Sequence, residues 1–254
     1  MKKTMMMLLA LAGAVAASES DLLWTVDFTG GSYAITTGDA WTGGAYSPST
    51  NWGSQDFDTT PGALTADGDK KVALEGANPG VGLSSEFTLT MNVNLTGTGG
   101  NDESDTAYWI ASLNQTQTSW FIGAQYDTTT QQVVVGNANH TLTNVTSYGT
   151  YALSDIKTIT LTMAGAQDAV GTFTIYVNGT KAAEANVAAG DRHNRSGFNN
   201  GVVFMNKMGE HDGVAGSITS ASLYSGVHTP VVPEPATATL SLLALAGLAA
   251  RRRR

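Results

Sequence analysis

The stretch EFTLTMNVNL (residues 86–95) decides the fold, because apolar and polar residues alternate through it. Its apolar residues are Phe87, Leu89, Met91, Val93 and Leu95. Threonine and asparagine occupy the positions between them. Successive side chains of a β-strand point to opposite faces, so a period of two predicts a strand with one buried face and one polar face.

Similar alternation recurs along the chain and predicts about a dozen short strands. Further candidates are LLWTVDF (22–28), AYWIASL (107–113), SWFIGAQY (119–126), QQVVVG (131–136), IKTITLTM (156–163), FTIYVNG (173–179), GVVFMN (201–206) and SITSASLY (217–224). Turn residues separate them, notably Asn178-Gly179, a pair that favours a tight two-residue hairpin. No internal segment has a helical pattern. The sequence therefore predicts an all-β fold, an antiparallel two-sheet sandwich.

The N-terminal sequence MKKTMMMLLALAGAVAASES (1–20) has the layout of a secretory signal peptide. Two lysines precede an apolar run, and Ala14-Val15-Ala16 supplies small residues for signal peptidase. The run is too short to span a bilayer permanently. We expect export, with a signal helix over residues 1–17 that is removed by cleavage after Ala16 or Ala17.

The C-terminal sequence VVPEPATATLSLLALAGLAARRRR (231–254) ends on an apolar stretch and four arginines. As a helix, residues 236–250 would rise roughly 22 Å, short of the ~30 Å hydrocarbon core. The arginine cluster would stay on the cytoplasmic side, so the stretch predicts a short transmembrane helix that anchors marginally. Its flank is Arg251, Arg252, Arg253 and Arg254. The prolines break the helix and hold Pro233-Glu234-Pro235 extended beside the membrane.

This order of parts resembles the PEP-CTERM sorting signals of Gram-negative bacteria, with Pro233, Glu234 and Pro235 as the sorting motif. The resemblance implies cleavage by an exosortase-type enzyme. The protein would be tethered to the membrane through residues 231–254 and would then reach the cell surface, the outer envelope or the medium. A tail anchor that is never cut is the alternative.

Residues 18–230 remain as one domain, a length that suits a single β-sandwich. The chain has no cysteine, so an exported domain of this kind depends on its own core. Six of the thirteen Lys and Arg residues lie in the two terminal segments. Seven therefore remain against twenty of the twenty-one acidic residues, a net charge of −13. This charge disfavours binding to nucleic acid or to an anionic lipid surface.

The run TITLTM…GTFTIYVNGTKAAEANV (158–187) resembles the core hairpin of the laminin-G or concanavalin A-like jelly roll. GSITSASLYSG (216–226) resembles the last strand of that fold, and LLWTVDFTGG (22–31) fits its first strand, which lies nearby. The resemblance implies a lectin-like jelly roll over the whole domain. An immunoglobulin-like or another sandwich is the alternative.

Glycoside-cleaving members of that superfamily present two carboxylates on one strand face, as E-x-D-x-x-E. We find no such strand. The acidic clusters, such as Asp56-Phe57-Asp58, lie in segments rich in turn residues. We therefore expect no catalytic residues and no enzyme. A secreted carbohydrate-active enzyme, a glycoside hydrolase or lyase, is the alternative.

The same resemblance implies one calcium ion near the rim of the sandwich. Calcium prefers oxygen ligands on flexible loops, which makes ADGDK (66–70), GNDESD (100–105) and GEHDG (209–213) candidate loops. The candidate ligands are Asp67, Asp69 and Asp212. Solvated acidic turns are the alternative for each.

Three large aromatic residues lie in DAWTGGAYSPSTNWGS (39–54), a segment with many turn residues. Trp41, Tyr46 and Trp52 are candidates for stacking on sugar rings, and capping one end of the core is their alternative role. Trp109 and Trp120 lie in strand patterns and are expected in the core. The predicted function is a non-catalytic, lectin-like surface protein that binds glycans or envelope or matrix components. A spacer without a small ligand is a further alternative.

Overall fold

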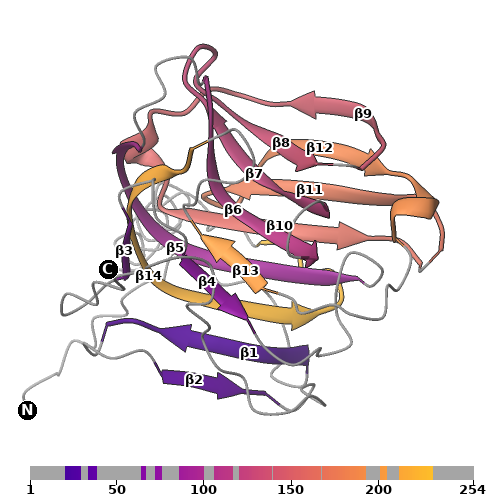
Figure 1. The fold of residues 1–254 in the computed structure, drawn as a ribbon, viewed down its shortest axis with the longest axis horizontal. Coiled ribbons are helices and arrows are strands. Elements are labelled where there is room, and N and C mark those ends of the chain that lie inside the picture. The colour runs from indigo at the N-terminus through magenta and orange to yellow at the C-terminus, as the bar shows by residue number, and fades with distance from the viewer. Residues whose placement is uncertain are drawn as a thin grey trace, which may run out of the picture.

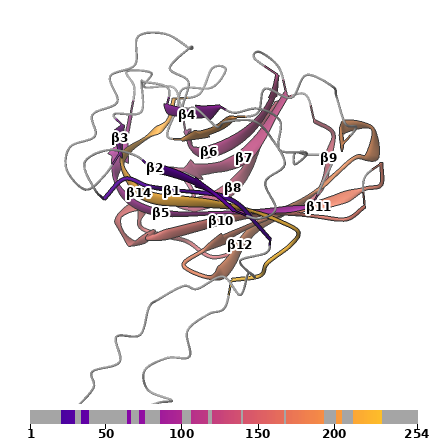
Figure 2. The ribbon, with the colours of Figure 1, turned by 90° about the horizontal axis from the view of Figure 1, so that it is seen from below.

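The computed structural model describes residues 21–29, 34–38, 64–66, 72–75, 86–99, 106–116, 120–138, 140–166, 168–192, 201–204 and 212–230. These residues form two antiparallel sheets packed face to face (Figure 1). Figure 2 shows the sandwich from its edge, with β4, β6 and β7 in one layer and β1, β14, β5 and β10 in the other.

The larger sheet has nine strands within the described part of the chain. In spatial order they are β2 (Ala34–Thr37), β1 (Leu22–Asp27), β14 (Val214–Ser225), β5 (Phe87–Thr98), β10 (Thr158–Ala164), β11 (Gly171–Val177), β12 (Thr180–Val187) and β9 (Leu142–Ser147), and β3 (Leu64–Ala66) also pairs with β14. The smaller sheet has five, in the order β4 (Val72–Glu75), β13 (Gly201–Phe204), β6 (Ala107–Thr116), β7 (Trp120–Asp127) and β8 (Gln132–Ala138). The described helical turns are the 3₁₀ turns η2 (Leu153–Asp155) and η3 (Ala189–Arg192).

Strand β5 forms as its alternation predicts. Its apolar residues are buried in the main core, and Asn92 and Asn94 on its other face are exposed. It pairs with β14 on one side and β10 on the other, so it lies centrally in the nine-stranded sheet. The main core therefore fills the space between the sheets. Its largest fully buried apolar side chains include Trp24, Phe28, Phe87 and Phe173.

The Asn178-Gly179 pair forms the predicted two-residue turn between β11 and β12. Both residues have positive φ, 50° and 82°, as the tight hairpin requires. The Asn178 side chain also anchors the turn to the start of β10. Its Oδ1 accepts hydrogen bonds from the backbone N–H groups of Lys157 (2.8 Å) and Thr158 (3.0 Å), and its Nδ2 donates to the carbonyl of Asp155 (2.8 Å).

The structure confirms the all-β, antiparallel two-sheet fold and the pairing of the first predicted strand with the last, β1 with β14. The structure adds four strands that the sequence analysis does not predict, β2, β3, β4 and β9; β12 is expected from the jelly-roll resemblance and not from alternation. Strand β9 lies at the edge of the sheet, and four of its six residues are exposed, so its sequence does not alternate. The predicted signal helix (1–17) and C-terminal transmembrane helix lie outside the described residues. Among the residues that are described, no helix has the length and apolar character needed to cross a membrane.

Candidate functional site

Most residues that the sequence nominates for sites lie outside the described residues. They are Trp41, Tyr46, Trp52, Asp67, Asp69, Pro233, Glu234, Pro235, Arg251, Arg252, Arg253 and Arg254. Their roles therefore stay predictions.

Asp212, the third candidate calcium ligand, lies two residues before β14 and is fully buried. Its carbonyl accepts a hydrogen bond from the backbone N–H of Trp109 on β6 (2.9 Å), and the next residue, Gly213, forms a β-bridge with Trp109. Its backbone thus joins the two sheets. Within the described ranges, no three His, Cys, Asp or Glu residues gather closely enough to hold a metal ion.

The outer side of the nine-stranded sheet carries hydroxyl and amide side chains over several strands. We call one part of it the hydroxyl–amide face, meaning the outward polar residues of β1, of β14 as far as Ser222, of β5 from Thr90 to Thr96, and of the start of β10; the outward ring of Tyr224 lies next to it at the end of β14. The members of the face are Thr25, Asp27, Ser217, Ser220, Ser222, Thr90, Asn92, Asn94, Thr96 and Thr158. The alternate residues of these strands point inward and belong to the main core. All ten residues retain exposed surface.

The strand register aligns these side chains in rows. One row runs from Thr25 through Ser222 and Thr90 to Thr160. A second runs from Asp27 through Ser220 and Asn92 to Thr158. Neighbouring strands lie about 4.8 Å apart, and alternate residues of one strand lie about 6.7 Å apart. The face is therefore a two-dimensional array of short polar groups.

Hydrogen bonds between neighbouring strands hold several of these side chains. The Thr25 and Ser222 hydroxyls share a hydrogen bond of 2.7 Å, and those of Thr90 and Thr160 share one of 3.1 Å. Asn92 Nδ2 donates to Ser220 Oγ at 2.8 Å. Because threonine is also restricted at χ1 by its branched Cβ, the array presents fixed rather than freely rotating groups.

Charge is sparse on the hydroxyl–amide face. Asp27 is the only charged residue among its ten members. The carboxylate of Asp27 accepts hydrogen bonds from the hydroxyl (2.6 Å) and the backbone N–H (2.8 Å) of Thr29, and these two bonds lower its pKa. Lys157 lies at the border, with Nζ 3.5 Å from Asn94 Oδ1.

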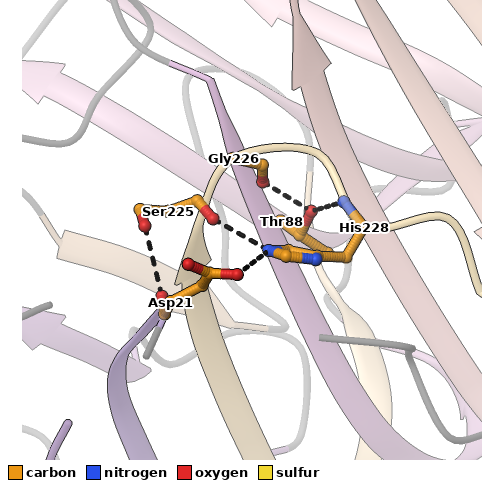
Figure 3. A network of polar contacts seen from close by, with 5 residues as sticks. All are labelled: Asp21, Thr88, Ser225, Gly226 and His228. Carbon is orange, nitrogen blue, oxygen red and sulfur yellow. Dashed lines mark hydrogen bonds and ion pairs between the residues drawn. The ribbon is translucent and has the colours of Figure 1, made fainter. Parts of the chain in front are cut away.

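A second polar cluster joins the two ends of the domain (Figure 3). We call it the terminal clasp, formed by Asp21, Thr88, Ser225, Gly226 and His228. The side chain of His228 is 13% exposed, and its Nε2 lies 3.7 Å from Asp21 Oδ2. The same nitrogen is 2.9 Å from the Ser225 carbonyl, which can only accept, so Nε2 carries the hydrogen.

The backbone around His228 is held as well. Its N–H donates to Thr88 Oγ1 (2.8 Å), and that hydroxyl donates to the carbonyl of Gly226 (2.9 Å). The imidazole also meets the ring of Tyr224 edge-on, with 5.7 Å between centroids. The chain that follows β14 is therefore fastened to the outer side of β5, beside the first residue of the described domain.

The five-stranded sheet carries an aromatic pair on the side opposite the main core. Trp109 and Phe121 meet edge-on with 5.2 Å between ring centroids. Gly123 lies between their positions on that face and has no side chain to separate the two rings. Trp109 is only 2% exposed and Phe121 8%, so both are buried, in a small cluster apart from the main core. The prediction that Trp109 is buried is therefore confirmed, although its side chain lies outside the main core. The side chain of Trp120 is not among those that the structure describes.

Arg192, in η3, is fully buried and shapes a turn rather than a binding surface. Its guanidinium donates to the carbonyls of Gly165 (2.7 Å), Ala166 (2.7 Å) and Ala169 (3.1 Å), which belong to the connection between β10 and β11. Burial lowers its pKa, and the nearby carboxylates of Glu86 and Asp168 oppose this shift.

Comparison with known proteins supports the predicted sandwich fold and the predicted sorting signal at the C-terminus. Residues 231–254 match the family described as the PEP-CTERM protein-sorting motif. Domain 4 of AbnA, a GH43 extracellular arabinanase from Geobacillus stearothermophilus solved with arabinotriose, superposes with a TM-score of 0.51 at 12% identity, covering 82% of this chain and 94% of that one.

Two further structures superpose less closely. The CBM40 of the Ruminococcus gnavus IT-sialidase, bound to α2,3 sialyllactose, gives a TM-score of 0.40 at 15% identity, over 64% of this chain and 89% of that one. The carbohydrate recognition domain of Emp47p gives 0.40 at 9% identity, over 84% and 100%. No curated protein sequence matches the chain.

The domain is thus an antiparallel two-sheet β-sandwich of the jelly-roll kind, a fold that it shares with domain 4 of AbnA. The chain carries a PEP-CTERM protein-sorting motif behind it, over residues 231–254. This motif indicates an exported protein that is sorted to the cell surface.

The sequence indicates part of the hydroxyl–amide face and nothing of the terminal clasp. The alternation in residues 86–95 shows that Thr90, Asn92 and Asn94 share one face. It cannot show the register that aligns them with Ser220 and Ser222. The terminal clasp leaves no signal, because its members meet only once β1, β14 and β5 are side by side.

Proposed function

We propose that this protein is exported, processed by an exosortase-type enzyme, and displayed at the cell surface or released, where its sandwich binds glycans or envelope or matrix components without turnover. The finer steps of the route, signal peptidase cleavage and a transient membrane tether, belong to this proposal. The observation that carries it is the sorting motif at residues 231–254 directly behind a lectin-like sandwich.

The sorting half is tested by changing Pro233-Glu234-Pro235 to three alanines in the native host. We expect uncut protein to accumulate in the inner membrane fraction, because the extended motif beside the membrane is lost. The matched control changes Thr237, Thr239 and Ser241 to alanine, which keeps the motif and the apolar stretch. Normal processing of the triple-alanine motif variant would overturn the sorting role.

Two observations support the binding half. The arabinanase domain that shares this fold was solved with arabinotriose. This chain also has an outward array of hydroxyl and amide groups, which are the groups that bond to sugar hydroxyls. The predicted loop aromatics Trp41, Tyr46 and Trp52 would add stacking surface.

Glycan binding is tested with the processed protein on a glycan array. Retention that weakens on Trp41→Ala or Trp52→Ala would place the sugar at the 39–54 segment. No retention on any glycan would refute the binding role and leave a spacer.

The absence of turnover needs its own assay. Incubation of the processed protein with the polysaccharide that retains it should release no reducing sugar. Release of reducing sugar or of unsaturated products would instead make the protein a carbohydrate-active enzyme.

A further inference from the structure

We propose that the hydroxyl–amide face of the nine-stranded sheet is a binding surface for an extended, uncharged polysaccharide. This inference rests on the proposed glycan-binding function and gives it a location and a ligand class. It differs from the location that the sequence suggests, the aromatic segment at 39–54.

The composition of the face excludes most other partners. Nucleic acid and anionic lipid both need a basic surface, and the hydroxyl–amide face has no Lys or Arg among its members. Protein interfaces and membrane insertion need aromatic or aliphatic anchors; this set has none, and the neighbouring ring of Tyr224 packs edge-on against His228. A polymer whose surface is itself hydroxyl groups is the partner that remains.

The hydrogen-bonding capacity of the array is only partly used within the protein. Thr25 Oγ1 is 3.2 Å from the Ala221 carbonyl, to which it can donate, and it shares a bond with Ser222. If Thr25 donates to that carbonyl, Ser222 is the donor in the shared bond and keeps both of its acceptor sites. Asn92 donates one amide hydrogen to Ser220 and keeps its carbonyl oxygen and its second hydrogen. Ser222 and Asn92 therefore both keep hydrogen-bonding positions that a ligand can use.

The rigidity of the array favours binding to a polymer over a short sugar. Cross-strand hydrogen bonds and branched side chains already fix the groups, so binding costs little side-chain entropy. Each contact between uncharged groups is weak, and no aromatic ring belongs to the array. The rows repeat, however, so an extended chain can make several contacts at once. We expect strong retention by a polymer and weak binding of a trisaccharide.

The electrostatics select an uncharged polymer. The mature region carries a net charge of −13, so an acidic polysaccharide is repelled. Asp27 lies at the edge of the second row and adds to this repulsion locally. The rest of the face offers no compensating cation beyond Lys157 at its border.

The test uses the processed, full-length mature protein and insoluble polysaccharides. Depletion from solution is measured on cellulose, chitin, starch and a carboxylated cellulose. Two variants place a charge of either sign on the face: Asn92→Lys at its centre, and Asn94→Glu, which faces Lys157. Both positions are exposed. Thr150→Lys and Ser154→Glu are the matched controls, because both are exposed and lie outside the strands.

We expect at least one uncharged polysaccharide to deplete the protein, and both face variants to lose roughly tenfold in affinity. The two controls should bind within about twofold of the unchanged protein, and all four should keep its thermal midpoint. Loss with one sign of charge only, or stronger binding to carboxylated cellulose, would overturn the assignment of an uncharged ligand.

The outcomes distinguish the proposed binding surface from the more general proposal that the protein binds glycans. Unchanged binding in both face variants, with loss in Trp41→Ala, would refute the face and keep glycan binding. Failure of the unchanged protein to bind any polysaccharide or arrayed glycan would refute both.

Discussion

The imidazole of His228 lies 3.7 Å from the carboxylate of Asp21, so the two ends of the described domain are in contact (Figure 3). Asp21 directly precedes β1, and His228 follows β14, and these two strands are paired. The contact is therefore a consequence of the sheet order and of the turn at Gly226, whose φ is +78°.

His228→Ala should lower the free energy of unfolding by about 1 kcal/mol, because it removes one partly buried hydrogen bond and the edge contact with Tyr224. Chemical denaturation of the processed protein measures this. Val227→Ala is the matched control, because the neighbouring side chain is 39% exposed. Equal stability of His228→Ala and the unchanged protein would show that the terminal clasp does not stabilise the fold.

Arg192→Ala should cost about 3 kcal/mol, because the buried guanidinium is lost as the shared donor to three backbone carbonyls. Arg192→Lys should recover only part of this, since an ammonium cannot reproduce the planar fork of donors. Gly190→Ala in the same turn is the control, because an added Cβ there meets no atom within 4 Å. A loss under about 0.5 kcal/mol for Arg192→Ala would contradict a structural role.

Gly123→Ala should destabilise the protein by about 3 kcal/mol, because its Cβ would lie 2.1 Å from the backbone carbonyl oxygen of Ala111. That backbone cannot move without disturbing the pairing of β6 with β7. Gly97→Ala on β5 is the matched control, with open space around the added Cβ. Urea unfolding compares the two, and similar midpoints would refute the predicted clash.

The Lys181–Glu184 pair on β12 should give a small pH dependence. Their side chains are 2.6 Å apart, and the hydrogen bond from Lys181 lowers the pKa of Glu184 below its ordinary value of 4.5. Because the pKa of Glu184 is lower in the folded state than in the unfolded state, the ionised carboxylate stabilises the fold at pH values above the unfolded-state pKa. This contribution disappears as the pH falls through the lowered, folded-state pKa.

Glu184→Gln should therefore lower stability at pH 7 by no more than about 0.5 kcal/mol, because the pair is exposed. The difference from the unchanged protein should vanish once the pH has fallen through the lowered pKa of Glu184. Unfolding curves at several pH values measure this. A difference that persists in strong acid would mean that the substitution acts through packing rather than charge.

The sequence predicts the fold well where strands alternate strictly and poorly where burial is incomplete. Strand β5 and the Asn178-Gly179 turn are predictable because each depends on neighbours in the chain. Strand β9 is not, because an edge strand with Val145 54% exposed has no buried face to enforce alternation.

The candidate sites are harder to predict, for a related reason. The PEP-CTERM motif is contiguous, so the order of residues along the chain is enough to recognise it. The rows of the hydroxyl–amide face and the burial of Arg192 depend on register and on contacts between distant segments. No pattern of neighbouring residues in the sequence predicts these rows or the burial of Arg192.

The sheet order also determines when this protein can finish folding. Strand β1 follows the predicted signal peptide, yet its partners are β2 and β14. Strand β14 ends at Ser225, shortly before the segment that begins at residue 231. A chain exported from its N-terminus therefore keeps one edge of β1 unpaired until translocation is nearly complete. Under the proposed membrane tether, closure of the nine-stranded sheet would fall at the moment when segment 231–254 enters the membrane, so folding and anchoring would coincide in time.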